Sequence, residues 1–211
     1  QGELSALCMK KTSSLEEKET TGNEILVYNS EEALSDMLYQ KNLDTSPCGL
    51  LIKKDIVLSN PFPVGKLHED DFTTYKYYLS AHKTIVSQDV CYFYYQRAGS
   101  IMHVFGQANM DELDAADNLV TFCEKHYPQL IAAAKSKKFS DYCQVLLSNK
   151  DIKTTYPEAY ARICDYLDNV KFEIVRDKKC RAKNRIAALL CIINKNLLIA
   201  AKKFAEAGTA P

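Results

Sequence analysis

The chain has 211 residues, 46% of them hydrophobic and 26% charged, which is the composition of an ordinary soluble globular protein. Its 27 basic side chains balance its 27 acidic ones, so it lacks the basic excess typical of nucleic-acid-binding proteins, and we expect no nucleic-acid partner. No stretch reaches the roughly 20 apolar residues of a membrane-spanning helix.

The eight cysteines are spread along the chain without a closely spaced pair. Zinc and redox sites usually need such pairs, so we expect small buried thiols in a reducing compartment. A disulfide framework is the alternative. Residues 1–11 lack the basic start and long apolar core of a secretory signal. Together these features predict a cytoplasmic protein.

Short strand and helix patterns alternate in the first part of the chain. Residues 4–9 and 24–28 predict two strands, separated by a polar loop at 11–24. Residues 30–41 predict a helix, because apolar side chains recur there at spacings of three and four and two acids stand in the first turn. Ser30 is expected to cap that helix.

A turn and a third helix are expected next. The apolar segment 50–58 leads into a proline-containing run at 60–63, which favours an extended or turning backbone. Gly65 is suited to a tight turn. Apolar and aromatic residues at helical spacing then predict an amphipathic helix at 70–82, with three acids at its start.

Two short strands, at 84–87 and 91–96, are expected before the pattern becomes helical. The predicted helices of the second half lie at about 110–125, 128–147, 155–170 and 180–206. The chain therefore predicts an α/β (α+β) arrangement, a mixed sheet with flanking helices followed by an all-helical C-terminal region. We place the two parts at residues 1–108 and 109–211.

Two motifs carry the strongest functional information. The first reads Phe62-Pro63-Val64-Gly65-Lys66-Leu67-His68-Glu69-Asp70-Asp71-Phe72-Thr73-Thr74-Tyr75-Lys76. The second reads Tyr92-Phe93-Tyr94-Tyr95-Gln96-Arg97-Ala98-Gly99-Ser100-Ile101-Met102. Over residues 47–102 the chain resembles the second half of bacterial family 2 glycosyltransferases, which carry Phe-Pro-x-Gly-Lys-x-x-Glu-Asp, a Thr-Tyr-Lys helix and a Tyr-rich strand ending in Gln-Arg-x-Gly-Ser-Ile.

This resemblance implies the acceptor-side portion of a GT-A-like fold. It also implies a nucleotide-sugar donor, a glycan or lipid-linked acceptor of the cell-envelope kind, a divalent metal (Mg or Mn), and single-displacement transfer with inversion. By the resemblance, Asp70 is the general base that takes the proton of the acceptor hydroxyl, and Glu69 is its supporting neighbour. From spacing alone, the same acids can simply complement the dipole of a surface helix.

Four further residues of the motifs are candidate substrate contacts. Lys66 and His68 face either the acceptor or bulk solvent, and since no second histidine stands at ligand spacing we predict no metal site at His68. Gln96 and Arg97 match the family motif, and a guanidinium suits phosphate or carboxylate oxygens. The alternative for Arg97 is a structural ion pair, and Tyr95 stands where many relatives have another arginine.

The resemblance is incomplete at its upstream end. Family members bind the donor through an N-terminal half that ends in a metal-coordinating Asp-x-Asp, and no Asp-x-Asp occurs in these 211 residues. We therefore expect the metal and donor of the parent protein to bind through a part that this chain lacks, and neither metal binding nor turnover by this chain alone. A noncatalytic binding or assembly module is the alternative function.

The C-terminal region combines basic and apolar residues. Basic side chains at 176–185 precede an apolar run, so residues 176–206 can lie on an anionic membrane surface, which would place the protein at the inner face of the membrane. A packed helix or a homodimer contact is the alternative reading.

Overall fold

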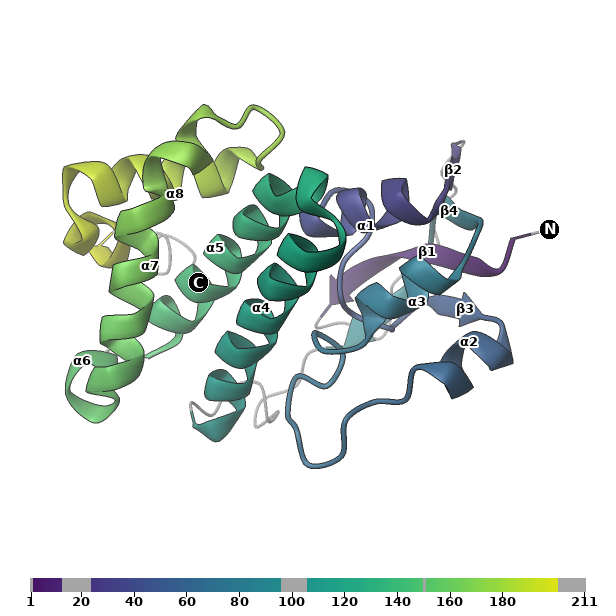
Figure 1. Cartoon of the computed structure of the whole chain (residues 1–211), viewed down its shortest axis with the longest axis horizontal. Coiled ribbons are helices and arrows are strands. Elements are labelled where there is room, and N and C mark those ends of the chain that lie inside the picture. Colours follow the sequence, from purple (N-terminus) through teal and green to yellow (C-terminus); the bar gives the residue numbers. More distant parts are fainter. Residues whose placement is uncertain (1, 13–23, 96–105, 150, 201–211) are drawn as a thin grey trace. The chain divides into compact units, whose positions relative to one another are not determined.

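A computed structural model describes residues 2–12, 24–95, 106–149 and 151–200 (Figure 1). Over these ranges the chain divides into two compact units, residues 1–108 and 109–211. The N-terminal unit combines a sheet with helices, and the C-terminal unit is helical. The expected mixed α/β arrangement with a helical C-terminal region is thus confirmed.

The N-terminal unit contains four described strands and three helices. In chain order these are β1 (Leu4–Thr12), β2 (Ile25–Tyr28), α1 (Ser30–Leu38), β3 (Leu50–Ile52), α2 (Lys54–Ser59), α3 (Thr74–Ser80) and β4 (Thr84–Tyr95). The sheet order is β2-β4-β1-β3, with β1 and β4 parallel and the two edge strands antiparallel to their neighbours. The sheet is therefore mixed.

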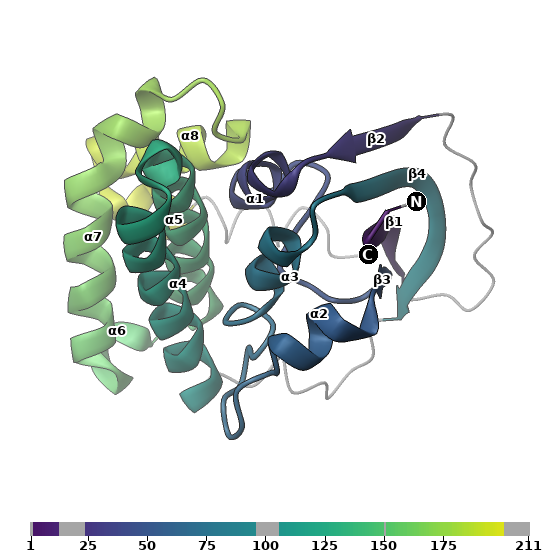
Figure 2. The ribbon, with the colours of Figure 1, turned by 45° about the vertical axis from the view of Figure 1, so that its right-hand side comes forward.

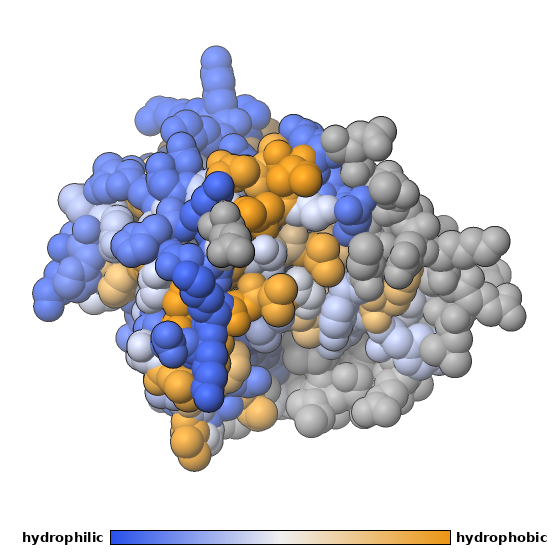
Figure 3. All heavy atoms as spheres, turned by 90° about the vertical axis from the view of Figure 1, so that its right-hand side faces the viewer, coloured by the Kyte–Doolittle hydropathy of each residue, from blue (hydrophilic) through white to orange (hydrophobic). Residues whose placement is uncertain are grey.

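The two faces of this sheet differ. Leu4, Ala6 and Val86 are buried on the face where α1 and α3 lie (Figure 2). On the opposite face, Leu51 and Val27 are exposed and share a register row across the four strands. Figure 3 shows apolar side chains gathered in patches on the face that it displays.

Helix α1 begins as the acids of its first turn suggest, but its cap is Asn29 and not Ser30. The Asn29 carboxamide accepts a hydrogen bond from the Glu32 amide at 2.9 Å, and the Glu32 carboxylate accepts one from the Asn29 amide at 2.9 Å. This reciprocal pair satisfies two backbone donors that a helix start leaves open. Ser30 instead donates to the Ala81 carbonyl at 2.9 Å, which ties the helix start to the end of α3.

The prediction of a helix over 70–82 is wrong at its start. Helix α3 covers only Thr74–Ser80, and the three acids lie in the turns that precede it. The Asp70 carbonyl accepts hydrogen bonds from the amides of both Thr73 and Thr74, at 3.0 and 2.9 Å. The three acids therefore belong to the turns that lead into the helix and not to its first turn.

The two strands predicted at 84–87 and 91–96 form one strand, β4. The polar residues between them, Ser87 to Asp89, coincide with register shifts where β1 and β4 pair. The Ser87 hydroxyl and the Asp89 carboxylate bond to one another at 2.8 Å. The β-bulge accommodates these polar residues within the strand, where their side chains satisfy one another, so polarity alone did not mark a strand end.

The C-terminal unit consists of helices α4 (Gln107–His126), α5 (Ile131–Ser148), α6 (Ile152–Thr155), α7 (Pro157–Arg176) and α8 (Ala182–Ile193), with a 3-10 turn, η2 (Pro128–Leu130). Pro128 and Pro157 stand in first turns, where the missing amide of proline costs no helix bond. The helix predicted at 180–206 is interrupted at Asn194, after which residues 195–200 are again helical. None of the described helices is long and apolar enough to cross a bilayer.

The cysteines largely follow the prediction of reduced thiols. Of the seven whose side chains the structure describes, four are buried, three are partly exposed and all are free. Burial raises the pKa of the Cys123 thiol to about 11, so that side chain stays a neutral, weakly reactive thiol at physiological pH.

Candidate functional site

The first motif folds into an exposed loop that leads into α3. Gly65 has a φ of 77°, a left-handed conformation that glycine adopts without strain, so its predicted role in a tight turn is confirmed. His68 has a φ of 58°, which is uncommon for a residue with a side chain. These two positions reverse the chain twice and place His68, Glu69, Asp70 and Asp71 on one short turn.

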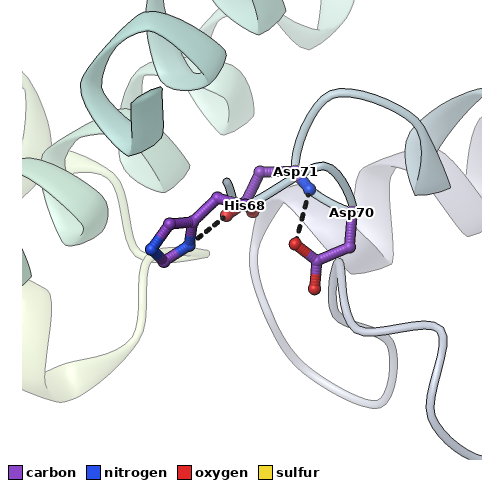
Figure 4. A group of neighbouring side chains, drawn as sticks. All are labelled: His68, Asp70 and Asp71. Atoms are coloured by element: carbon purple, nitrogen blue, oxygen red, sulfur yellow. Dashed lines mark hydrogen bonds and ion pairs between the residues drawn. The ribbon is translucent and has the colours of Figure 1, made fainter. Parts of the chain in front are cut away.

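Three side chains of this turn lie close together (Figure 4). The His68 Nδ1 atom is 3.4 Å from an Asp71 carboxylate oxygen, with both side chains largely buried. The Asp70 carboxylate accepts a hydrogen bond from the Asp71 amide at 3.0 Å. Glu69, in contrast, is exposed. Of the three acids in the motif, Asp70 and Asp71 are thus partly buried, and Glu69 lies on the surface.

The environment of Asp70 changes its acidity. The pKa of this carboxyl is raised to about 6, first by burial and second by the neighbouring charge of Asp71. The bond from the Asp71 amide and the charge of His68 act in the opposite direction, while Glu69 adds a smaller upward effect. Asp70 is thus harder to ionise than an ordinary aspartate, mainly because of burial, although it lies directly before the helix N-terminus.

At pH 7 a carboxyl with a pKa near 6 is still mostly ionised, and it is a stronger base than an ordinary aspartate. The backbone of Asp70 is held in place because its carbonyl accepts hydrogen bonds from the two amides at the start of α3. Asp70 therefore combines fixed position with basicity near neutral pH. Asp71 is the neighbouring acid with the larger effect on the pKa of Asp70, and Glu69 has a smaller one. Only the adjacency of Asp71 in the motif pointed to this effect, and the supporting role of Glu69 stays a prediction.

Polar groups without partners lie directly after the acids. Thr73, Thr74 and Tyr77 are buried, and their side-chain oxygens have no hydrogen-bond partner within the described part of the chain. Buried hydroxyls normally find a partner, in protein or in ordered water. The start of α3 therefore has unused hydrogen-bonding capacity beneath the acidic turn.

The other predicted substrate residues do not join this group. Lys66 is exposed, and its Nζ atom lies 5.7 Å from the centre of the Phe72 ring, a cation–π contact within its own loop. Gln96 and Arg97 lie outside the described residues. The structure therefore brings together Asp70, His68 and Asp71, and leaves Lys66 on the surface.

The turn also brings together side chains that could bind a metal ion. Within the described ranges, His68, Asp70 and Asp71 form a group whose potential ligand atoms all lie within 4.8 Å of one another. One imidazole and two carboxylates suit a transition metal better than Mg. The family's own metal depends on an Asp-x-Asp that the sequence does not contain, so the residues present do not fit that metal in the family manner.

A cavity of about 250 Å³ lies beside β1 in the same unit. It is lined by polar side chains of the segment after α1, including Asn42, Asp44 and Ser46, and by Gln88 of β4. Tyr78 of α3 also lines it and donates to the Asp44 carbonyl at 3.1 Å. Of the predicted site residues that the structure describes, none lines this cavity. Its sequence signal is the run of short polar residues between α1 and β3.

Asp36 organises that polar segment. Its buried carboxylate accepts hydrogen bonds from the amides of Asn42 and Leu43, both at 2.9 Å. It also accepts bonds from the Tyr28 hydroxyl and the Asn42 carboxamide, at 3.0 and 3.1 Å. Four donors satisfy the buried charge and fix one wall of the cavity.

Comparison with models of known protein families finds no match. Comparison with curated proteins finds none either. The resemblance to family 2 glycosyltransferases therefore rests on the two motifs.

Proposed function

We propose that this chain is the acceptor-side part of an inverting glycosyltransferase that uses a nucleotide-sugar donor, with Asp70 as the general base. The observation that carries the proposal is the Asp70 carboxylate, half-buried, fixed at the start of α3 and with its pKa raised to about 6. The motifs shared with family 2 glycosyltransferases support the reaction class.

The chemistry assigned to Asp70 is a single proton transfer. As the acceptor hydroxyl attacks the anomeric carbon, its proton passes to the Asp70 carboxylate and a new carbon–oxygen bond forms. The electrons of the breaking sugar–phosphate bond leave with the nucleoside diphosphate. A base with a pKa near the working pH performs such a transfer best, because it is ionised before the reaction and still binds the proton firmly.

The proposal leaves donor and metal binding to residues outside this sequence, since it contains no Asp-x-Asp. The acceptor is proposed to be a glycan or lipid-linked hydroxyl compound. His68 and Asp71 are positioning residues in this scheme, because their contact holds the turn on which Asp70 stands. No step is assigned to a metal.

The test is Asp70→Asn in the full product of the gene that encodes this sequence, assayed for sugar transfer from a panel of nucleotide sugars. Loss of a general base should lower kcat by about 10²–10⁴-fold. The matched control is Glu69→Gln, an exposed neighbouring carboxylate, which should lower kcat far less. Near-normal transfer by Asp70→Asn would exclude Asp70 as the base.

A second measurement separates the proposal from its alternative. Transfer by the wild-type protein should increase with pH through about 6, following ionisation of Asp70. If no nucleotide sugar in the panel supports transfer, the noncatalytic binding or assembly module becomes the better assignment.

A further inference from the structure

The charge of the chain is unevenly distributed near its C-terminus. Residues 171–199 contain eight basic side chains and two acidic ones, whereas the whole chain is neutral. Residues 178–199 contain no acidic side chain. A local positive charge of this size creates a surface potential that can attract an anionic partner, although the chain as a whole is neutral.

The structure gathers four of these cations at one end of a helical hairpin, which we call the basic tip. Arg176 lies in the last turn of α7, Lys178 and Lys179 lie in the connection, and Lys183 lies in the first turn of α8; all four are exposed. Two arginines of the same segment, Arg181 and Arg185, form hydrogen bonds to α5 and α7.

Arg181 donates to the Ser140 hydroxyl of α5 at 2.8 Å. Arg185 donates to the Val175 carbonyl of α7 at 3.1 Å. These bonds fix the connection between α7 and α8, so the basic tip is held on a structured turn.

An apolar stripe, Ile186, Leu189 and Ile193, continues from the basic tip along α8. The exposed fractions of these three side chains are 57%, 46% and 73%. Their spacing of three and four residues places them on one helix face. The other face of α8 buries Ala188 and Cys191, and α8 contacts both α5 and α7. The stripe is therefore the outer face of a packed helix.

We propose that the apolar stripe and the basic tip bind the surface of an anionic lipid bilayer, with α8 lying in the plane of the interface. Apolar side chains on one helix face enter the boundary between headgroups and acyl chains, and lysine and arginine side chains beside them meet the lipid phosphates. At 12 residues, α8 is about 18 Å long, too short to cross a bilayer.

Charge complementarity favours a lipid surface over a second copy of the chain. A two-fold contact through the stripe would bring the same residues together from both copies. Because residues 178–199 offer no carboxylate, the cations of one copy would find no partner in the matching segment of the other. Anionic headgroups supply the missing charge.

The experiment is co-sedimentation of the full chain with phosphatidylcholine vesicles and with vesicles that also contain phosphatidylglycerol. The proposal expects binding to the anionic vesicles, weak binding to the neutral ones, and a clear loss of binding at high salt. Two variants test the two parts of the surface: Ile186→Ser with Leu189→Ser and Ile193→Ser, and Lys178→Glu with Lys179→Glu and Lys183→Glu. Each should reduce partitioning at least about tenfold.

Matched controls use exposed residues elsewhere. Leu58→Ser with Val64→Ser removes exposed apolar side chains from the N-terminal unit, and Lys153→Glu reverses an exposed charge on α6. Both should bind as the wild type does, and thermal melting should show that all variants fold.

Two results would overturn the proposal. One is equal binding by the wild type and by both surface variants. The other is a wild-type protein that does not bind vesicles but forms a dimer, while the triple serine variant is monomeric. That result would assign the stripe to contact with a second copy.

Discussion

At the scale of single residues, Asp70 is ionised at a thermodynamic cost. The pKa of this carboxyl in the folded protein is about 6, above its ordinary value of 3.8. Folding therefore takes up a proton between these values, and stability falls as pH rises from about 4 to 6 and remains lower above that window. An ionised Asp70 at pH 7 makes the folded state less stable than a neutral side chain would.

Asp70→Asn should accordingly stabilise the protein at pH 7 by roughly 1–2 kcal/mol while leaving stability near pH 4 almost unchanged. Asparagine retains an oxygen that can accept the bond from the Asp71 amide. Chemical denaturation at both pH values measures the effect, with Glu69→Gln as the exposed control. A variant destabilised equally at both pH values would show that the carboxylate has a structural role instead.

A second carboxylate is buried with a charged partner. Lys137 and Asp141 lie one turn apart on α5, and the Lys137 Nζ atom is 2.7 Å from both carboxylate oxygens. Only 4% and 9% of the two side chains are exposed. Removing one partner takes from the other buried charge a counter-ion in direct contact, which is more costly than removing both partners.

Lys137→Met should therefore destabilise the protein by about 3–5 kcal/mol, and Lys137→Met with Asp141→Leu should be less destabilised than either single variant. Urea denaturation of the three variants measures this coupling. Lys135→Met is the control, because Lys135 and Glu173 form an ion pair of similar length, 2.8 Å, in exposed surroundings. Its cost should stay below about 1 kcal/mol. Additive single effects at 137 and 141 would contradict the prediction.

The sequence motif predicted single residues better than it predicted their contacts. The turn that it predicted at Gly65 is confirmed, and the catalytic role of Asp70 stays a prediction. The motif did not predict that Asp71 contacts His68, because that contact depends on the left-handed backbone at His68. The cavity around Asn42 and Asp44 was missed for a related reason, since the segment is shaped by Asp36 from the preceding helix.

At the scale of elements, the start of α1 depends on one side chain. The Asn29 carboxamide oxygen accepts a hydrogen bond from the Glu32 backbone amide. The Glu32 carboxylate in turn accepts one from the Asn29 backbone amide. Asn29→Ala should cost about 1 kcal/mol of stability, whereas Asn29→Asp should keep the cap at little cost. Thermal or chemical unfolding distinguishes the two variants. Equal destabilisation by alanine and aspartate would show that the carboxamide oxygen is not the stabilising group.

Periodicity predicted where most helices and strands lie but not where two of them end. Helix α3 starts later than 70 because the carbonyl of Asp70 accepts two successive amides and the acids remain in the preceding turns. Strand β4 continues through Ser87 to Asp89 because side chains satisfy one another there. In both cases local polar bonds decided the boundary, and sequence patterns do not encode those bonds.

At the scale of the whole molecule, the division at residues 108 and 109 gives the C-terminal unit its own core. Leu113 of α4, Phe139 of α5 and Leu167 of α7 are fully buried. An Arg162 side chain on α7 also bonds to Asp114 and Asp117 of α4. Apolar burial and polar contacts therefore connect helices within one unit, as an independently folding domain requires.

Residues 106–211, which keep α4 whole, should fold when produced alone, with a helical circular dichroism spectrum and one cooperative thermal transition. A shorter piece, residues 106–176, lacks α8 and uncovers the faces of α5 and α7 that α8 contacts. It should melt at a lower temperature or without cooperativity, because buried Ala188 and Cys191 no longer fill that space. If residues 106–211 show no cooperative transition, the helical unit depends on residues 1–105 for its fold.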